Sequence, residues 1–193
     1  MFQDFHKDIG VLRQFLIHEK YGEAVRYLDE LQAPVQDLTA AVWTGDETAD
    51  YLINSKAAAA EADGIRFQAR VEFPRHTNIR SVDLCAILGN LLDNAIEAAR
   101  QVPERSGRTV DLTIRRIHQM LVIKVENSFA AAPVREGGEL KTTKTGGGLH
   151  GWGLKSAQTA AEKYEGMVQA GVSGAVFRAV ATLSYQRMEE IHE

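Results

Sequence analysis

The sequence lacks three features that would narrow its class at once: a second cysteine, a long hydrophobic run and an excess of positive charge. Cys85 therefore has no internal disulfide partner, and its apolar neighbours favour a packing role over reactivity. No apolar run reaches the roughly 18 residues of a membrane-spanning helix, and Met1 is not followed by a signal-peptide pattern. The net charge of -4 offers no basic surface for nucleic acid, whereas 45% hydrophobic residues suffice for a compact core.

Apolar residues recur at alternating three- and four-residue intervals in the N-terminal part of the chain. They are Phe2, Phe5, Ile9, Leu12 and Leu16 in a first stretch and Ala24, Leu28, Leu31, Val35 and Leu38 in a second. This spacing predicts an antiparallel pair of helices joined near Tyr21-Gly22, with a kink or break at Pro34. Because such a hairpin cannot bury its apolar seam alone, we expect residues 1–42 to pair with a second copy in a four-helix bundle.

Residues 43–193 are expected to form an α/β domain. The predicted helices are 46–62, 81–102 and 153–164, and the predicted strands are 65–73, 110–114, 121–125, 166–170 and 175–183. The segment 129–150 is long and rich in Gly, Thr and Lys, which predicts a mobile lid. The fold class is therefore α+β, with helices on one face of a mixed, largely antiparallel sheet.

Two asparagines stand four residues apart in the apolar stretch ILGNLLDNAIEAA, residues 87–99. In a helix, the amides of Asn90 and Asn94 share one face. Asparagine is a poor helix former and is costly to bury without partners, so the pair is explained by a polar ligand or by a structural role. A hydrated Mg²⁺ that carries phosphate oxygens suits neutral amides, because this ion keeps most of its waters.

A glycine-rich stretch, TGGGLHGWGLKSA, occupies residues 145–157 and precedes a predicted helix that begins at about Gly153. A glycine-rich turn at a helix start presents free N–H groups and the positive end of the dipole to phosphate. A flexible surface loop is the alternative interpretation of a glycine cluster.

Three short motifs now stand in order along the chain. They are Asn90 to Asn94, Val125-Glu126-Asn127-Ser128 and His150-Gly151-Trp152-Gly153-Leu154. With them the sequence resembles the GHKL ATP-binding family, in particular the sensor histidine kinases. Asn127 replaces the usual aspartate of the family, and this departure is characteristic of the quorum-sensing peptide-receptor (AgrC-like) branch. The segments WTGDETADYLINSK and AEKYEGMVQAGVSGAVFRAVATL also match that branch.

The resemblance implies a site for ATP and Mg²⁺. Asn94 is expected to hold the metal, Asn90 to support the phosphates, and Gly151 and Gly153 to cradle them through backbone N–H groups. Leu154 completes the glycine motif.

The resemblance also assigns roles to Asn127 and to the predicted lid. Asn127 occupies the place of the adenine-reading aspartate, and a turn-initiating role is the alternative. Lys144 in the lid is expected to contact phosphate, although this lysine, Lys141 and Lys155 are equally explained as solvated charges.

His6 is the candidate phosphoacceptor. In the resembled kinases a histidine six residues before a leucine, as His6 is before Leu12, attacks the γ-phosphate of ATP. The family normally has an acidic residue directly after this histidine, but here it is Lys7, and later polar positions are lost to Gly10 and Val11. An ordinary surface histidine is the alternative interpretation.

The resemblance implies the cytoplasmic part of a two-component sensor histidine kinase. Such a kinase works as a homodimer, passes phosphate from histidine to an aspartate of a response regulator, and usually follows an upstream membrane sensor domain. A naturally soluble protein is the alternative to a fragment of a membrane-bound sensor.

Three other functions compete with this interpretation. The main alternative is a catalytically weak pseudokinase or scaffold that binds ATP, a response regulator or both. A serine kinase of the anti-sigma type is disfavoured by the N-terminal heptads. A gyrase-like ATPase is disfavoured because Asn90 stands where water-splitting relatives carry a glutamate.

Overall fold

The computed structural model describes residues 10–11, 13–24, 27, 41–130, 134–136, 139–141 and 150–187. The chain divides into two compact units, Met1–Thr39 and Ala40–Glu193. Within the described residues no helix is long and apolar enough to cross a membrane.

The described residues of the first unit are helical at 10–11, 13–17, 21–24 and 27. The first helical stretch ends in a Schellman turn, in which Lys20 N–H donates to Phe15 O (2.8 Å) and Glu19 N–H donates to Leu16 O (3.2 Å). Glu19 takes the left-handed position with φ 56°, so the turn precedes the predicted Tyr21-Gly22 connection and does not use its glycine. The predicted helical hairpin is not confirmed, because most of its seam lies outside the described residues.

The second unit contains a five-stranded sheet of order β1-β2-β3-β7-β6. Its strands are β1 (Arg66–Val71), β2 (Thr109–Ile117), β3 (Met120–Asn127), β6 (Met167–Ser173) and β7 (Val176–Ser184). The β1–β2 pair is parallel and the other pairs are antiparallel, which confirms the mixed, largely antiparallel sheet. A separate antiparallel pair, β4 (Val134–Glu136) and β5 (Glu139–Lys141), lies within the segment for which the sequence predicts a loop.

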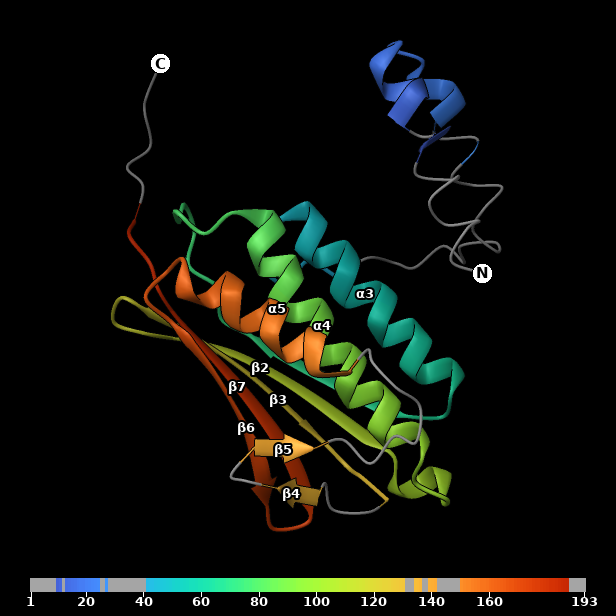
Figure 1. Cartoon of the computed structure of the whole chain (residues 1–193), viewed down its shortest axis with the longest axis vertical. Helices are drawn as coiled ribbons and strands as arrows, with labels where there is room; N and C mark the ends of the chain where they lie inside the picture. The colour runs from blue at the N-terminus through green and yellow to red at the C-terminus, as the bar shows by residue number, and fades with distance from the viewer. Residues whose placement is uncertain are drawn as a thin grey trace. The chain divides into compact units, whose positions relative to one another are not determined.

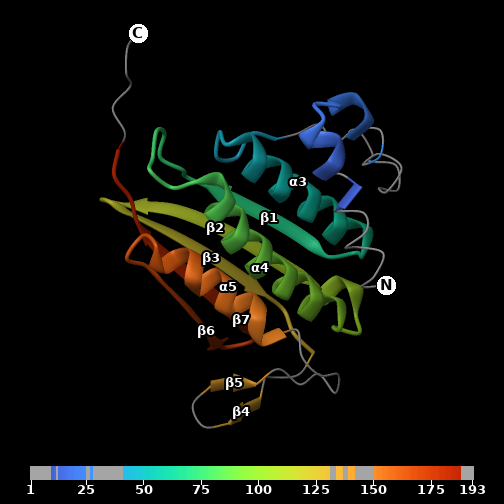
Figure 2. The ribbon, with the colours of Figure 1, turned by 45° about the horizontal axis from the view of Figure 1, so that its top comes forward.

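Three helices cover one face of this sheet: α3 (Glu47–Ala62), α4 (Ser81–Arg100) and α5 (His150–Glu162) (Figures 1 and 2). The helices and alternate residues of the central strands form the buried core. Core positions on β2 and β3 are Val110, Leu112, Ile114, Leu121, Ile123 and Val125, and α4 contributes Leu88, Leu91 and Leu92. The alternation follows from the two-residue repeat of a strand, so the intervening side chains point to the other face.

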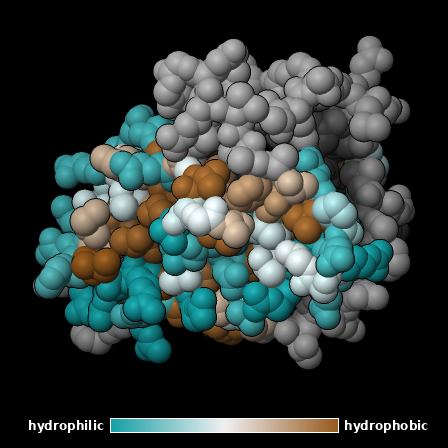
Figure 3. All heavy atoms as spheres, turned by 90° about the horizontal axis from the view of Figure 1, so that it is seen from below, coloured by the Kyte–Doolittle hydropathy of each residue, from teal (hydrophilic) through white to brown (hydrophobic). Residues whose placement is uncertain are grey.

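A short 3₁₀-helix, η1 (Arg105–Gly107), precedes β2. Figure 3 shows the protein from below the view of Figure 1, where the coloured part of the surface carries both hydrophobic and hydrophilic residues.

The segment WTGDETADYLINSK forms the loop before α3 and most of the helix itself. Asp46 caps α3 by accepting a hydrogen bond from Ala49 N–H (2.9 Å). The buried carboxylate of Asp50 accepts hydrogen bonds from Thr44 N–H (2.7 Å) and Gly45 N–H (3.1 Å). The polar residues of this segment therefore organise the start of the domain, since buried carboxylates need such donors.

Serine favours the N-cap position of a helix, but Ser81 is the first residue of α4 and does not cap it. Arg80 is the N-cap residue and makes no side-chain capping hydrogen bond. The Ser81 hydroxyl instead hydrogen-bonds the carboxylate of Asp46, which ties the start of α4 to the start of α3.

Candidate functional site

Gly153 on α5 lies directly against the two asparagines of α4. A β-carbon placed on Gly153 would stand 3.0 Å from Asn90 Oδ1 and 3.8 Å from Asn94 Nδ2. A contact of 3.0 Å is at the limit of what a carbon tolerates, so this close approach of α5 depends on glycine. The fold therefore brings together the first and third motifs of the sequence.

The Asn90 amide is held by its own helix. Its Nδ2 donates to the carbonyl of Ala86, one turn earlier, at 2.6 Å. The carbonyl oxygen of the same amide faces Gly153, and both Asn90 and Asn94 are half-buried and retain access to solvent. The result is a partly open pair of amides on one helix face, as their spacing predicted.

The donor set of this site consists of neutral amides. Within the described part of the chain, no group of three His, Cys, Asp or Glu side chains is placed to hold a metal ion. An amide oxygen beside a small open cradle fits a Mg²⁺ ion that keeps its waters and arrives with phosphate oxygens, whereas a protein-built cage would require more carboxylates. The residues present thus fit a metal that is bound together with a polyphosphate.

The third motif forms the first turn of α5, which begins at His150. The sequence instead predicts a helix start at about Gly153, because glycine disfavours helix interiors. The first N–H groups of a helix have no acceptor within the helix, and Gly151 belongs to this first turn. Leu154 is half-buried and packs against the core, so it anchors the turn to the domain.

Asn127 is the last residue of β3 and only 2% exposed. It lies opposite Val110 of β2 and Phe177 of β7, and its Nδ2 donates to the carbonyl of Ser128 at 2.8 Å. Among the described residues no hydrogen bond joins Asn127 to the asparagines of α4. The structure thus buries Asn127 at a strand end but does not bring it into contact with Asn90 or Asn94.

Of the candidates His6, Lys141, Lys144 and Lys155, only Lys155 has a described side chain. His6 and Lys144 lie outside the described residues, and Lys141 is placed only through the backbone of β5. Lys155 is exposed on α5.

An unpredicted polar cluster joins the other end of the α4–α5 pair. The Asp83 carboxylate, 3% exposed, accepts hydrogen bonds from Lys163 Nζ (2.6 Å), Tyr164 OH (2.8 Å) and Arg80 Nε (2.9 Å). The Tyr164 hydroxyl also accepts from Arg80 N–H at 2.9 Å. This cluster fixes α5 along α4, because Asp83 meets the end of α5 while Asn90 meets its first turn.

The charge of Asp83 is stabilised despite its burial. Burial alone would raise the pKa of the Asp83 carboxyl, but the hydrogen bonds from Lys163, Tyr164 and Arg80 outweigh it and lower the pKa to about 2. The sequence indicates only that Asp83 favours the N-terminal end of its helix. Nothing in the sequence pairs Asp83 with Tyr164, since these residues meet only after α5 has packed on α4.

Solved structures that share this fold include those of ThkA, ShkA and AdeS. The nucleotide-free catalytic domain of histidine kinase ThkA has 16% identity over 74% of this chain and 94% of its own, with a TM-score of 0.54. Full-length ShkA in complex with AMPPNP is 18% identical to this chain. The match covers 81% of this chain and 33% of ShkA, with a TM-score of 0.57. Histidine kinase AdeS of Acinetobacter baumannii is 11% identical to this chain. The match covers 94% of this chain and 96% of AdeS, with a TM-score of 0.53. At these identities the likeness establishes a common fold.

No curated protein sequence matches this chain. A family model described as a GHKL domain matches residues 79–182, which are more than half of the 193 residues. The matched segment includes α4, α5 and the strands between and after them, and it therefore contains all three motifs. The chain belongs to the GHKL domain family.

Proposed function

We propose that this chain is the cytoplasmic catalytic region of a two-component sensor histidine kinase of the quorum-sensing peptide-receptor (AgrC-like) branch. The observation that carries the proposal is the contact of Gly153 with Asn90 and Asn94. This contact places two half-buried amide side chains beside the first turn of a helix. Helix N–H groups bind phosphate, and amide oxygens can bind the accompanying cation.

In this proposal the phosphates of ATP lie beside the amides of α4 and the first turn of α5. Asn94 holds Mg²⁺, Asn90 accepts or donates hydrogen bonds on the same face, and the N–H groups near Gly151 and Gly153 point to phosphate oxygens. A Mg²⁺ ion held by Asn94 would supply charge neutralisation at the phosphates. The protein itself contributes by positioning the phosphates. The close approach of Gly153 to Asn90 fixes the first turn of α5 beside the amides of α4.

The adenine end of the nucleotide is assigned to Asn127. Its amide carries both a donor and an acceptor, and the hydrogen bond to the Ser128 carbonyl engages only one N–H. In this proposal the carbonyl oxygen and the second N–H of the amide recognise the purine edge. Lys144 and the segment 129–150 are assigned to a lid over the phosphates.

The reaction proposed is transfer of the γ-phosphoryl group to His6. A neutral ring nitrogen attacks the γ-phosphorus, an N–P bond forms, and the bond from phosphorus to the β–γ bridging oxygen breaks to release ADP. The phosphoryl group then passes to an aspartate of a response regulator. Because Asn90 is not a base, activation of water for hydrolysis has no support at this position.

The architecture proposed for the whole chain has residues 1–42 as a dimerising phosphotransfer hairpin and 43–193 as the ATP-binding domain. The break between compact units after Thr39 supports a boundary near this place. The expected partners are a second copy, a response regulator and an upstream membrane sensor domain.

Phosphate transfer is tested by incubating the full chain with Mg²⁺ and γ-labelled ATP. The expected result is an acid-labile, base-stable label on the wild type that is lost in both His6→Gln and Asn94→Asp. Nucleotide binding without label would favour the pseudokinase alternative, which the unusual Lys7 after His6 also motivates.

A further inference from the structure

The face of the sheet away from the helices is basic, although the whole chain has a net charge of -4. Alternation along the strands places five basic residues on this face: Arg66, Arg70, Arg115, Lys124 and Arg178. Asp111 and Glu126 are the acidic residues of the same strands on this face. The excess of positive charge is therefore local to one surface.

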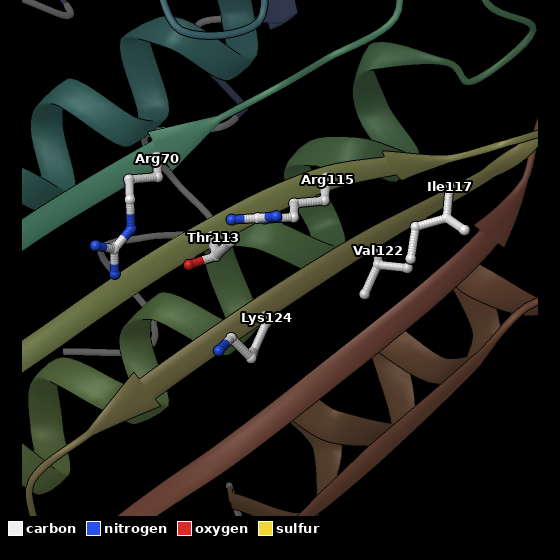
Figure 4. Close-up of a pocket in the computed structure, with 6 residues that line it drawn as sticks. All are labelled: Arg70, Thr113, Arg115, Ile117, Val122 and Lys124. Carbon is white, nitrogen blue, oxygen red and sulfur yellow. The ribbon is translucent and has the colours of Figure 1, made fainter.

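A groove of about 260 Å³ lies within this basic face. It is lined by Arg70 of β1, by Thr113, Arg115 and Ile117 of β2, and by Val122 and Lys124 of β3 (Figure 4). The strand register sets these side chains side by side, because Thr113 lies opposite both Arg70 and Lys124. Arg115 is likewise opposite Val122. The helices lie behind the strands in this view, so the groove is separate from the asparagine pair.

The positive charge of the groove is only partly compensated. Lys124 Nζ pairs with Glu126 at 2.6 Å, and the same carboxylate also binds Arg178 at 2.6 Å. Among the residues that the structure describes, neither Arg70 nor Arg115 makes an ion pair, and both are exposed. Arg70 and Arg115 therefore both lie beside the Thr113 side chain (Figure 4).

One end of the groove is apolar. Ile117 is 53% exposed, and Met120, opposite it in the register, is 41% exposed. Val122 continues this apolar end toward Lys124. A ligand that fits the groove along its length thus presents negative charge at one end and an apolar group at the other.

We propose that the groove binds an acidic segment of a partner protein. A carboxylate of this segment lies between Arg70 and Arg115 and accepts bidentate hydrogen bonds, which guanidinium groups favour. An adjacent apolar side chain of the segment packs on Ile117 and Val122. The concave shape suits a side chain better than a flat membrane surface, and the proposal is independent of nucleotide binding on the opposite face of the sheet.

The test uses the full chain and a fluorescein-labelled peptide of seven alternating Glu and Leu residues, with a Gln/Leu peptide of the same length as the uncharged control. Binding is followed by fluorescence anisotropy at 0.15 M salt. Arg70→Gln and Arg115→Gln are each expected to weaken binding of the acidic peptide at least fivefold. Arg66→Gln is the matched control, because it removes the same charge from the same face of β1 but outside the groove, and it is expected to change binding less than twofold.

Three results would overturn the proposal. An equal loss of peptide binding in Arg66→Gln would indicate that the whole basic face attracts the peptide and that the groove does not bind it specifically. Unchanged binding in Arg70→Gln and Arg115→Gln would place the peptide elsewhere. Co-sedimentation with phosphatidylserine vesicles that depends on these arginines, without peptide binding, would identify a membrane as the occupant. Thermal unfolding of each variant verifies that the exposed substitutions leave the fold intact.

Discussion

The carboxylate of Asp83 at the start of α4 accepts a hydrogen bond from the hydroxyl of Tyr164, just beyond the end of α5, at 2.8 Å. Lys163 donates to the same carboxylate at 2.6 Å. The two helices run in opposite directions, so this contact at one end determines which residue of α5 lies beside Asn90 at the other. Asp83 thus sets the geometry of a site that it does not touch.

Asp83→Asn is expected to lower the free energy of unfolding by about 2–4 kcal/mol, because it leaves buried donors poorly paired and removes a charge that three donors stabilise. Urea unfolding measures this change. Asp93→Asn is the control, since Asp93 is an exposed carboxylate paired only with Lys56 at 2.6 Å, and its expected cost is below about 1 kcal/mol. Equal effects of the two substitutions would show that the Asp83 cluster adds little stability.

The Asp83 cluster also predicts an acid sensitivity. The pKa of Asp83 is lowered from 3.8 to about 2 in the folded chain, so its stabilisation is present above about pH 4 and is lost as the pH falls toward 2. The contribution is on the order of 2 kcal/mol. The difference in stability between wild type and Asp83→Asn should therefore narrow over this range. A difference that stays constant down to pH 2.5 would contradict the assignment.

Gly89→Ala is expected to stabilise the protein by about 0.5–1 kcal/mol, because alanine is the better helix former and a β-carbon there meets only Leu52 Cδ2, at 3.8 Å. The measurement is thermal or urea unfolding. A loss of stability would show that α4 and α3 are packed more tightly than this contact distance indicates.

Asn127→Asp restores the residue usual in the family but is expected to destabilise the chain without nucleotide by about 1–3 kcal/mol. The reason is that a carboxylate would be buried and would face the Ser128 carbonyl, to which the Asn127 amide now donates at 2.8 Å. Urea unfolding of the nucleotide-free chain tests this. An unchanged or raised stability would indicate that Asn127 is not selected for its local hydrogen bond.

The sheet could be predicted well from the sequence because its strands alternate with a period of two. Val110, Leu112 and Ile114 are predicted to share one buried face, and they form part of the core. The stop of α3 is also predictable, since Gly64 takes φ 68° directly after Asp63. Such features depend on neighbouring residues, and one sequence is enough to find them.

Other features depend on contacts between distant segments or on glycines in unusual places. The sequence predicts too late a start for α5 because Gly151 and Gly153 disfavour helix on their own, whereas packing against Asn90 favours it. The turn after the helical residues 13–17 has Glu19 in a left-handed conformation where a glycine is expected. The Asp83 cluster and the basic groove require the strand and helix register, which no local pattern contains.

We propose that nucleotide phosphates bind where Gly153 meets Asn90 and Asn94. The most direct test is the affinity of Gly153→Ala for a fluorescent ATP analogue with Mg²⁺, measured beside wild type and Gly89→Ala. The added carbon must displace Asn90 Oδ1, 3.0 Å away, so affinity should fall at least tenfold in Gly153→Ala while Gly89→Ala binds as the wild type does. Unchanged affinity in a folded Gly153→Ala protein would place the nucleotide elsewhere on the domain.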